Sequence, residues 1–245
     1  MLSDSRPRRQ YRQVADQILQ LAAARGLGAG QRLPSERDLA ELLSVSRPSL
    51  REALIALEVE GHVEIRMGSG IYLGSGTDRV LLRADAEGPL ELLEARCILE
   101  GAIAEEVARH VTPELLRRLD DNLRQMRAAM DDTPLAIGID GAFHEIVASG
   151  LDNSVLSGLS AQMFQKRHSP FFARFASFFE RPLTWSEALA EHGRVRDALA
   201  ARDPVAARDA QRLQDAMRHH LTQSRLRFTE TVLVERAEGA ALQES

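Results

Sequence analysis

The chain is poor in cysteine, in aromatic side chains and in long apolar runs. It has one cysteine in 245 residues, Cys97, so a disulfide framework is excluded, and we interpret Cys97 as a buried, inert thiol. Only 4% of the residues are aromatic, while runs of Ala, Leu, Arg and Glu favour helices over sheet. No window of about 18 apolar residues and no signal-peptide stretch occurs. We therefore expect a helical, cytoplasmic protein that does not enter a membrane.

Basic side chains are outnumbered by acidic ones, 31 to 36, which bears on the class of partner. The formal net charge is -5, and over the whole chain this value argues against binding to nucleic acid. Residues 1–75, however, contain ten arginines against nine acidic residues, so the deficit lies in the remainder. The positions of the arginines therefore matter more than their sum.

Residues 33–57, LPSERDLAELLSVSRPSLREALIAL, contain two helical patterns separated by a tight break. Ser35 is suited to cap a first helix that reaches about Leu43, and Ser46 is suited to cap a second, longer helix. Residues 61–73, GHVEIRMGSGIYL, alternate apolar and polar side chains around a glycine turn, which predicts two short strands. Together these patterns predict a winged helix-turn-helix.

The second of these helices indicates a function. Ser46, Arg47, Ser49 and Arg51 lie at or just after its N-terminus, on what we expect to be its exposed side. This end of the helix enters the major groove in helix-turn-helix proteins. Arginine can make two hydrogen bonds to a guanine edge, and serine hydroxyls suit phosphate oxygens. We therefore expect contact with double-stranded DNA.

The rest of the chain has helical periodicity throughout. We predict a DNA-binding domain at residues 1–75, a linker at 76–88, an all-α bundle of about six to seven helices at 89–232 and a tail at 233–245. The fold class is therefore mainly α. The helices are expected at residues 89–110, 113–130, 134–149, 154–167, 171–179, 183–201 and 204–228.

A candidate metal site lies in this second half. Asp140 and His144 are four residues apart, so on a helix they project from one face and can hold one ion, with His192 as a third ligand. On spacing alone, an intrahelical hydrogen bond between Asp140 and His144 is the simpler interpretation. Such a site could also activate water, which makes a metal-dependent enzyme the alternative function. An enzyme, however, gives no reason for the first 75 residues.

From Tyr11 to Leu73 the sequence resembles the DNA-binding domain of the GntR superfamily of bacterial transcription regulators, through LPSERDLAELLSVSR, SLREALIALEVEG and GSGIYL. The resemblance implies a homodimer that reads a palindromic operator. It also implies operator contacts from the PSER arginine, from the start of the second helix and from the wing tip. By position these residues are Arg37, Ser46, Arg47, Ser49, Arg51 and Gly68.

The segments DGAFHEIV, EHGRVRDALAARDP and AMRHHL resemble the FCD ligand-binding domain of the FadR branch of that superfamily. The resemblance implies a divalent metal ion, Zn, Ni or Mn, held by Asp140, His144 and His192 beside a carboxylate effector. Arg96 would meet the effector carboxylate, and Arg167 is a second candidate for this role. An ordinary exposed arginine is the simpler interpretation of Arg167. The wording is most similar to regulators of hexuronate and related sugar-acid use, so we expect a repressor that a small carboxylate releases.

The fourth metal ligand has two candidates. The family spacing of 22 residues after His192 gives Gln214, whereas the AMRHHL wording points to His220. If the last two helices are antiparallel neighbours joined by a turn at residues 202–203, Gln214 lies level with His192, and His220 lies about 9 Å further along. We therefore favour Gln214, although a longer connection would restore His220.

Overall fold

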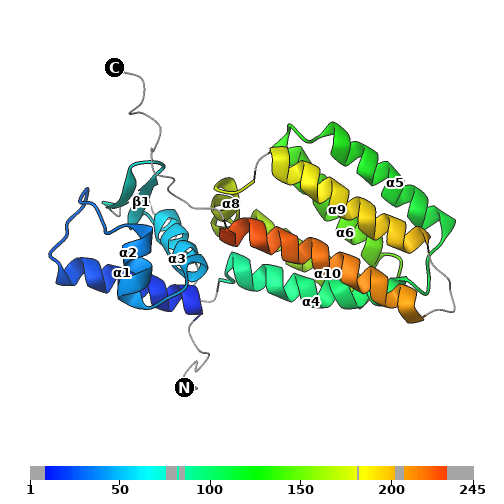
Figure 1. Ribbon diagram of the computed structural model, residues 1–245, viewed down its shortest axis with the longest axis horizontal. Coiled ribbons are helices and arrows are strands. Elements are labelled where there is room, and N and C mark those ends of the chain that lie inside the picture. The colour runs from blue at the N-terminus through cyan, green and yellow to red at the C-terminus, as the bar shows by residue number, and fades with distance from the viewer. Residues whose placement is uncertain (1–8, 76–81, 83–85, 181, 202–206, 231–245) are drawn as a thin grey trace, which may run out of the picture. The chain divides into compact units, whose positions relative to one another are not determined.

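The computed structural model describes residues 9–75, 82, 86–180, 182–201 and 207–230 (Figure 1). Within these residues it contains ten α-helices and one two-stranded sheet, which confirms the mainly α class. None of the described helices is long and apolar enough to cross a bilayer. The predicted tail and most of the predicted linker lie outside the described residues.

The described residues form two compact units. The first unit contains the described residues up to Pro89 together with Pro170–Phe178. The second unit contains the described parts of Leu90–Ser169 and Phe179–Phe228. Neither unit is therefore contiguous in sequence, whereas the sequence analysis predicted two contiguous domains.

The first unit is the predicted winged helix-turn-helix. Side-chain caps explain where its helices begin, because Ser35 Oγ accepts a hydrogen bond from the Asp38 amide and Ser46 Oγ accepts one from the Ser49 amide. Between them, Ser44 turns the chain in the left-handed region with φ of 54°. The elements are α1 (Gln10–Ala24), α2 (Glu36–Leu43), α3 (Arg47–Val59), β1 (Val63–Arg66) and β2 (Gly70–Leu73), with β1 and β2 antiparallel.

One helix from the second half of the sequence belongs to this first unit. Helix α8 (Pro170–Ser177) packs on α3, and the Phe171 ring lies 5.0 Å from the Tyr11 ring, centroid to centroid. The Arg174 guanidinium donates two hydrogen bonds, of 2.8 and 2.9 Å, to the Glu58 carboxylate on α3. Segment 170–178 is therefore built into the DNA-binding unit, which corrects the predicted domain boundaries.

The second unit is a bundle of helices. Thr112, Asp132 and Asn153 cap α5, α6 and α7 with their side-chain oxygens. The elements are α4 (Pro89–Val107), α5 (Pro113–Ala128), α6 (Thr133–Ala148), α7 (Ser154–Gln165), the 3-10 turn η1 (Lys166–His168), α9 (Pro182–Ala200) and α10 (Ala207–Glu230).

Five of these helices share one apolar core. Side chains such as Ile103, Leu119, Phe143, Val195 and Met217, from α4, α5, α6, α9 and α10, are almost fully buried in it. In Figure 1, α5, α6 and α9 lie on one side of this unit, with α4 and α10 on the other.

Helices α4 and α10 meet at the predicted inert cysteine. The Sγ atom of Cys97 lies 3.8 Å from Thr222 Oγ1 on α10. Cys97 is half-buried rather than buried, so the sequence-based expectation was wrong on this point.

Candidate functional site

The N-terminus of α3 presents several of the predicted DNA-contacting residues to solvent. Ser46 and Arg47 are exposed, and Ser49 is half-buried, where it shares a hydrogen bond with the Ser46 hydroxyl. Arg37, on α2, is also exposed, and its Nε lies 3.9 Å from an oxygen of Asp38. The Arg47 side chain is thus placed at a solvent-facing helix N-terminus, where an anion is favoured.

The wing tip is exposed as well. Gly68 sits in the turn between β1 and β2 with φ of 71°, a conformation that L side chains rarely adopt. Beside it, the guanidinium of Arg66 lies over the Tyr72 ring, 4.3 Å from the centroid. The turn therefore holds a tight bend whose backbone faces solvent.

Arg51 departs from the prediction. We expected it on the exposed side of α3, but the side chain is only 2% exposed, and its Nε donates a 2.7 Å hydrogen bond to Glu36 Oε1. The reason is that α2 packs on α3, so Glu36 in the first turn of α2 meets Arg51 in the second turn of α3. In this structure Arg51 holds the two helices together.

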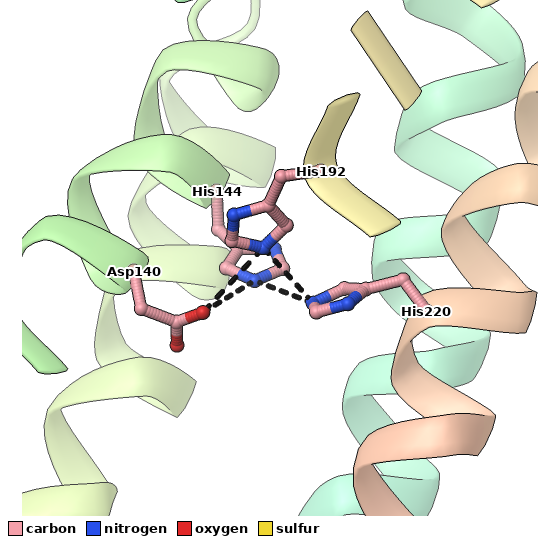
Figure 2. Close-up of side chains that lie close together, drawn as sticks. All are labelled: Asp140, His144, His192 and His220. Atoms are coloured by element: carbon pink, nitrogen blue, oxygen red, sulfur yellow. Dashed lines mark hydrogen bonds and ion pairs between the residues drawn. The ribbon is translucent and has the colours of Figure 1, made fainter. Parts of the chain in front are cut away.

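Four predicted or alternative metal ligands come together in the second unit (Figure 2). Asp140 and His144 lie one turn apart on α6, His192 comes from α9 and His220 from α10. All four side chains are buried, and one ligand atom from each lies within 4.8 Å of the others. Three of these residues, Asp140, His144 and His192, are the ones that the sequence analysis grouped together, and that they bind a metal ion stays a prediction.

The spacing within this cluster fits a metal ion. His220 Nε2 lies 3.1 Å from His192 Nε2 and 3.3 Å from His144 Nε2, and Asp140 Oδ1 lies 3.4 Å from His192 Nε2. Atoms that bind one ion tetrahedrally, each roughly 2.0–2.1 Å from it, lie about 3.3 Å apart. These three distances are close to that value, while Asp140 Oδ1 lies further from His144 Nε2, at 3.9 Å.

Two outer carboxylates orient the histidines. Glu100 Oε2 lies 2.5 Å from His144 Nδ1, and Glu191 Oε2 lies 2.8 Å from His220 Nδ1. A carboxylate beside Nδ1 favours the proton on that nitrogen, which leaves a lone pair on Nε2. The two Nε2 lone pairs then face each other at 3.3 Å. Without a proton on either nitrogen such an arrangement is repulsive, and a bound cation would relieve the repulsion.

Protonation in the cluster also suits a cation. Burial lowers the pKa of His192 and of His220, which keeps both imidazoles neutral at pH 7. Burial alone would raise the pKa of Asp140, but the Arg167 guanidinium outweighs this effect and lowers the pKa. The cluster therefore combines imidazole nitrogens with one carboxylate, the donor set that zinc and similar ions bind.

The preference for Gln214 was wrong. Gln214 Nε2 donates a hydrogen bond to Glu105 Oε2, whereas His220 lies in the cluster. The prediction assumed a tight turn with level helix ends. Helix α9 ends at Ala200 and α10 begins at Ala207. The six residues between them can span roughly 20 Å, so the helix ends need not be level.

A pocket lies beside the cluster, and it contains both predicted effector-binding arginines. The pocket is partly open to solvent, and Asp140, His144 and His220 form part of its wall. Arg96 and Arg167 also line it, and both are buried. Cationic side chains and the candidate metal site thus face one cavity.

Each of these arginines is already paired with a carboxylate. Arg96 Nε donates a 2.6 Å hydrogen bond to Glu100, and Arg167 Nη1 donates a 3.0 Å hydrogen bond to Asp140 and also pairs with Glu180. Burial alone would raise the pKa of Glu100, but Arg96 and His144 lower it to about 2. The pocket wall is therefore a network of charges in which every described arginine has a partner.

Sequence reasoning missed several residues of this site. Glu100 and Glu191 orient the histidines. One feature of the sequence could have indicated them, because each lies close to a predicted site residue on the same helix: Glu100 is four positions after Arg96, and Glu191 is one position before His192. Arg227 and Trp185 also line the pocket. Nothing in the local sequence distinguishes these two from other helical residues.

Comparison with known families agrees with this geometry. Residues 10–73 match the family described as bacterial regulatory proteins, gntR family, and residues 91–223 match the FCD domain. The first match covers the helix-turn-helix and the wing, and the second covers all four residues of the candidate metal site.

Curated relatives and solved structures point the same way. The chain is 35% identical over 214 residues to the Uxu operon transcriptional regulator of Escherichia coli (strain K12), which covers 81% of each chain. It is 37% identical over 177 residues to the Exu regulon transcriptional regulator of the same strain, covering 69% of this chain and 67% of that one. The solved structure of E. coli McbR/YncC shares the fold, with a TM-score of 0.50 and 18% identity over 91% of this chain and 98% of that one.

Proposed function

Because the chain belongs to the GntR family of bacterial regulatory proteins and carries an FCD domain, we propose that it is a homodimeric repressor that a sugar acid releases from DNA. The coarser part of this statement follows from the family: the chain is a ligand-responsive, DNA-binding transcription regulator, and its relatives are regulators rather than enzymes. The dimer, the sign of regulation and the effector are the proposal.

One observation carries the effector part of the proposal. The pocket brings buried arginines and the Asp140, His144, His192 and His220 cluster to one cavity. A carboxylate in this pocket would find guanidinium groups of matching geometry. The four clustered residues would hold a divalent ion, Zn, Ni or Mn, and such an ion supplies a further positive charge for carboxylate or hydroxyl oxygens.

The relatives support a sugar acid as the effector class. They are regulators of the Uxu operon and of the Exu regulon, and their likeness to this chain covers 81% and 69% of it. Effector binding alters DNA affinity only if the ligand binds one arrangement of the protein better than the other. In this pocket the arginines are already paired with carboxylates of the protein. An effector carboxylate would compete with those carboxylates for the guanidinium groups, so its binding would favour an arrangement in which the pairs are rearranged.

For the DNA-binding part, we propose contacts from Arg37, Ser46, Arg47, Ser49 and Gly68. Two copies of α3 related by a two-fold axis would read a palindromic operator. Arg51 is proposed to act indirectly, because its guanidinium is buried against Glu36 and fixes the angle between α2 and α3.

A direct experiment tests the proposal. An operator is first selected from random duplex DNA by the full-length protein, and its affinity is then measured by fluorescence anisotropy with and without D-glucuronate and D-galacturonate. We expect tight binding to a palindrome, weaker binding in the presence of one sugar acid, a dimer by sedimentation and bound divalent metal by elemental analysis. Failure to select any DNA sequence would contradict the proposal that the protein recognises an operator. Protein purified without chelator and free of metal would remove the metal from the proposal.

A further inference from the structure

The pocket contains a side chain whose polar group has no partner among the described residues. Trp185, near the start of α9, lines the pocket and is 3% exposed. Its Nε1–H group can only donate a hydrogen bond, and no described residue accepts one from it. Buried tryptophan N–H groups usually have an acceptor.

The indole is held firmly in place. Its ring packs in a small apolar cluster with Met126, Ala136 and Ala188, from α5, α6 and α9 itself. The guanidinium of Arg167 lies 5.7 Å from the centroid of the indole ring. The donor therefore sits on a rigid wall, close to an arginine that we propose as an effector contact.

From this arrangement we propose that Trp185 is a specificity-determining residue, whose Nε1–H donates a hydrogen bond to a hydroxyl or ring oxygen of the bound effector. The inference rests on the proposed function and narrows it. A ligand that offered only a carboxylate would leave the indole donor unsatisfied, whereas a polyhydroxylated acid brings an oxygen to it. A site built to bond a ligand oxygen discriminates strongly against an analogue that lacks it, because the buried group of the protein then stays unpaired.

The neighbouring wall supports an oxygen-rich ligand. Ser224 and Thr184 also line the pocket, beside the apolar ring of Phe228. Hydroxyl groups can both donate and accept, as the hydroxyls of a sugar acid require. The pocket thus combines cationic groups for a carboxylate with neutral polar groups for the rest of such a molecule.

The chain offers an intrinsic probe for the test, because Trp185 is its only tryptophan. Titration of the full-length protein with D-glucuronate or D-galacturonate is expected to change tryptophan emission in a saturable way. Cyclohexanecarboxylate, which has a six-membered ring and a carboxylate but no hydroxyls or ring oxygen, is expected to bind more weakly. Absence of binding by every carboxylate tested would defeat the proposed function and this inference together.

The variant Trp185→Phe tests the donor itself. Calorimetry is expected to show about tenfold weaker binding of the sugar acid, with unchanged binding of cyclohexanecarboxylate and unchanged metal content. Retained affinity for the sugar acid, or an equal loss for both ligands, would overturn the inference while leaving the proposed function standing.

A second replacement guards against misfolding of that variant. Because the chain has one tryptophan, feeding cells a benzothienyl analogue of tryptophan exchanges only the N–H of Trp185 for sulfur and keeps the ring shape. The same selective loss of sugar-acid affinity is expected. Full affinity in this protein would overturn the donor role.

Discussion

The arginines that we propose as ligand contacts have opposite surroundings in the two units. In the DNA-binding unit, Arg37 and Arg47 are exposed, and the Arg37 side chain retains 67% of its exposure. In the FCD unit, Arg96 and Arg167 are buried, and each is paired with a carboxylate. An exposed arginine keeps its hydration, so it lowers the stability of the fold little and remains available to bind an external anion. A buried arginine is tolerated only where carboxylates or other acceptors pair with it.

Arg51 crosses this division. It stands among the predicted DNA contacts in sequence, yet it is buried and ion-paired like the arginines of the FCD unit. Whether an arginine is buried and paired therefore depends on its surroundings and not on the unit that contains it. Mutations can test whether each arginine contributes to stability or to ligand binding.

The largest effect is expected at Arg51. Arg51→Ala leaves the Glu36 carboxylate buried without this partner, which should lower the free energy of unfolding of the DNA-binding unit by roughly 3–5 kcal/mol. The measurement is urea unfolding followed by circular dichroism. Arg47→Ala is the matched control on the same helix and should change stability by no more than about 0.5 kcal/mol. Equal effects of the two variants would contradict the division into buried and exposed arginines.

The next largest effect is expected on metal affinity at the candidate metal site. His220→Ala should lower metal affinity by more than the roughly 10–100-fold loss caused by removing an outer partner, because it removes a ligand. Gln214→Ala, on the same helix, should leave metal affinity unchanged, because Gln214 bonds Glu105 instead. Competition with a chelating dye measures both. The opposite ranking would restore Gln214 as the ligand.

Arg47→Ala should change the recognition of DNA sequence without changing the stability of the fold. If Arg47 bonds a base edge, Arg47→Ala should reduce discrimination between operator and random DNA by roughly 1–3 kcal/mol per site. Anisotropy titrations at one salt concentration, on both DNAs, measure the difference. A uniform loss on both DNAs would reassign Arg47 to phosphate contact.

The smallest effect is expected where α8 joins the first unit. The Arg174–Glu58 ion pair is partly exposed, with 41% of the arginine side chain accessible, so its coupling energy should be about 0.5–1 kcal/mol. A double-mutant cycle with Arg174→Ala and Glu58→Gln isolates this energy from the other hydrogen bond of Glu58, which accepts from the Ile65 amide. A coupling energy of zero would mean that α8 docks on α3 through its phenylalanines alone.

Much of the fold could be predicted because its signals are local. The caps at Ser35, Ser46 and Thr112 define helix starts within a few residues, and the described helices begin where these caps predict. The placement of α8 could not be predicted, because its phenylalanines show only that the helix has an apolar face. Periodicity shows that a face is apolar, and it does not show which surface covers it.

The candidate site divides in the same way. Asp140 and His144 are paired by the geometry of a single helix turn, so their shared face was visible in the sequence. His220 was misjudged because its height relative to His192 depends on the connection between α9 and α10 and on how those helices pack. Glu100, Glu191 and Trp185 were missed because they belong to the site only through helices brought together from distant parts of the chain.

The amino-acid sequence by itself determined the helices, the wing, the exposed Arg47 and the helical face that Asp140 shares with His144, because each depends on contacts within a few residues. Tertiary structure alone decided that Arg51 is buried, that His220 rather than Gln214 joins the cluster and that Trp185 faces the pocket. The physical reason is that burial and ligand geometry depend on which helix surfaces meet, and that is set by packing over the whole unit.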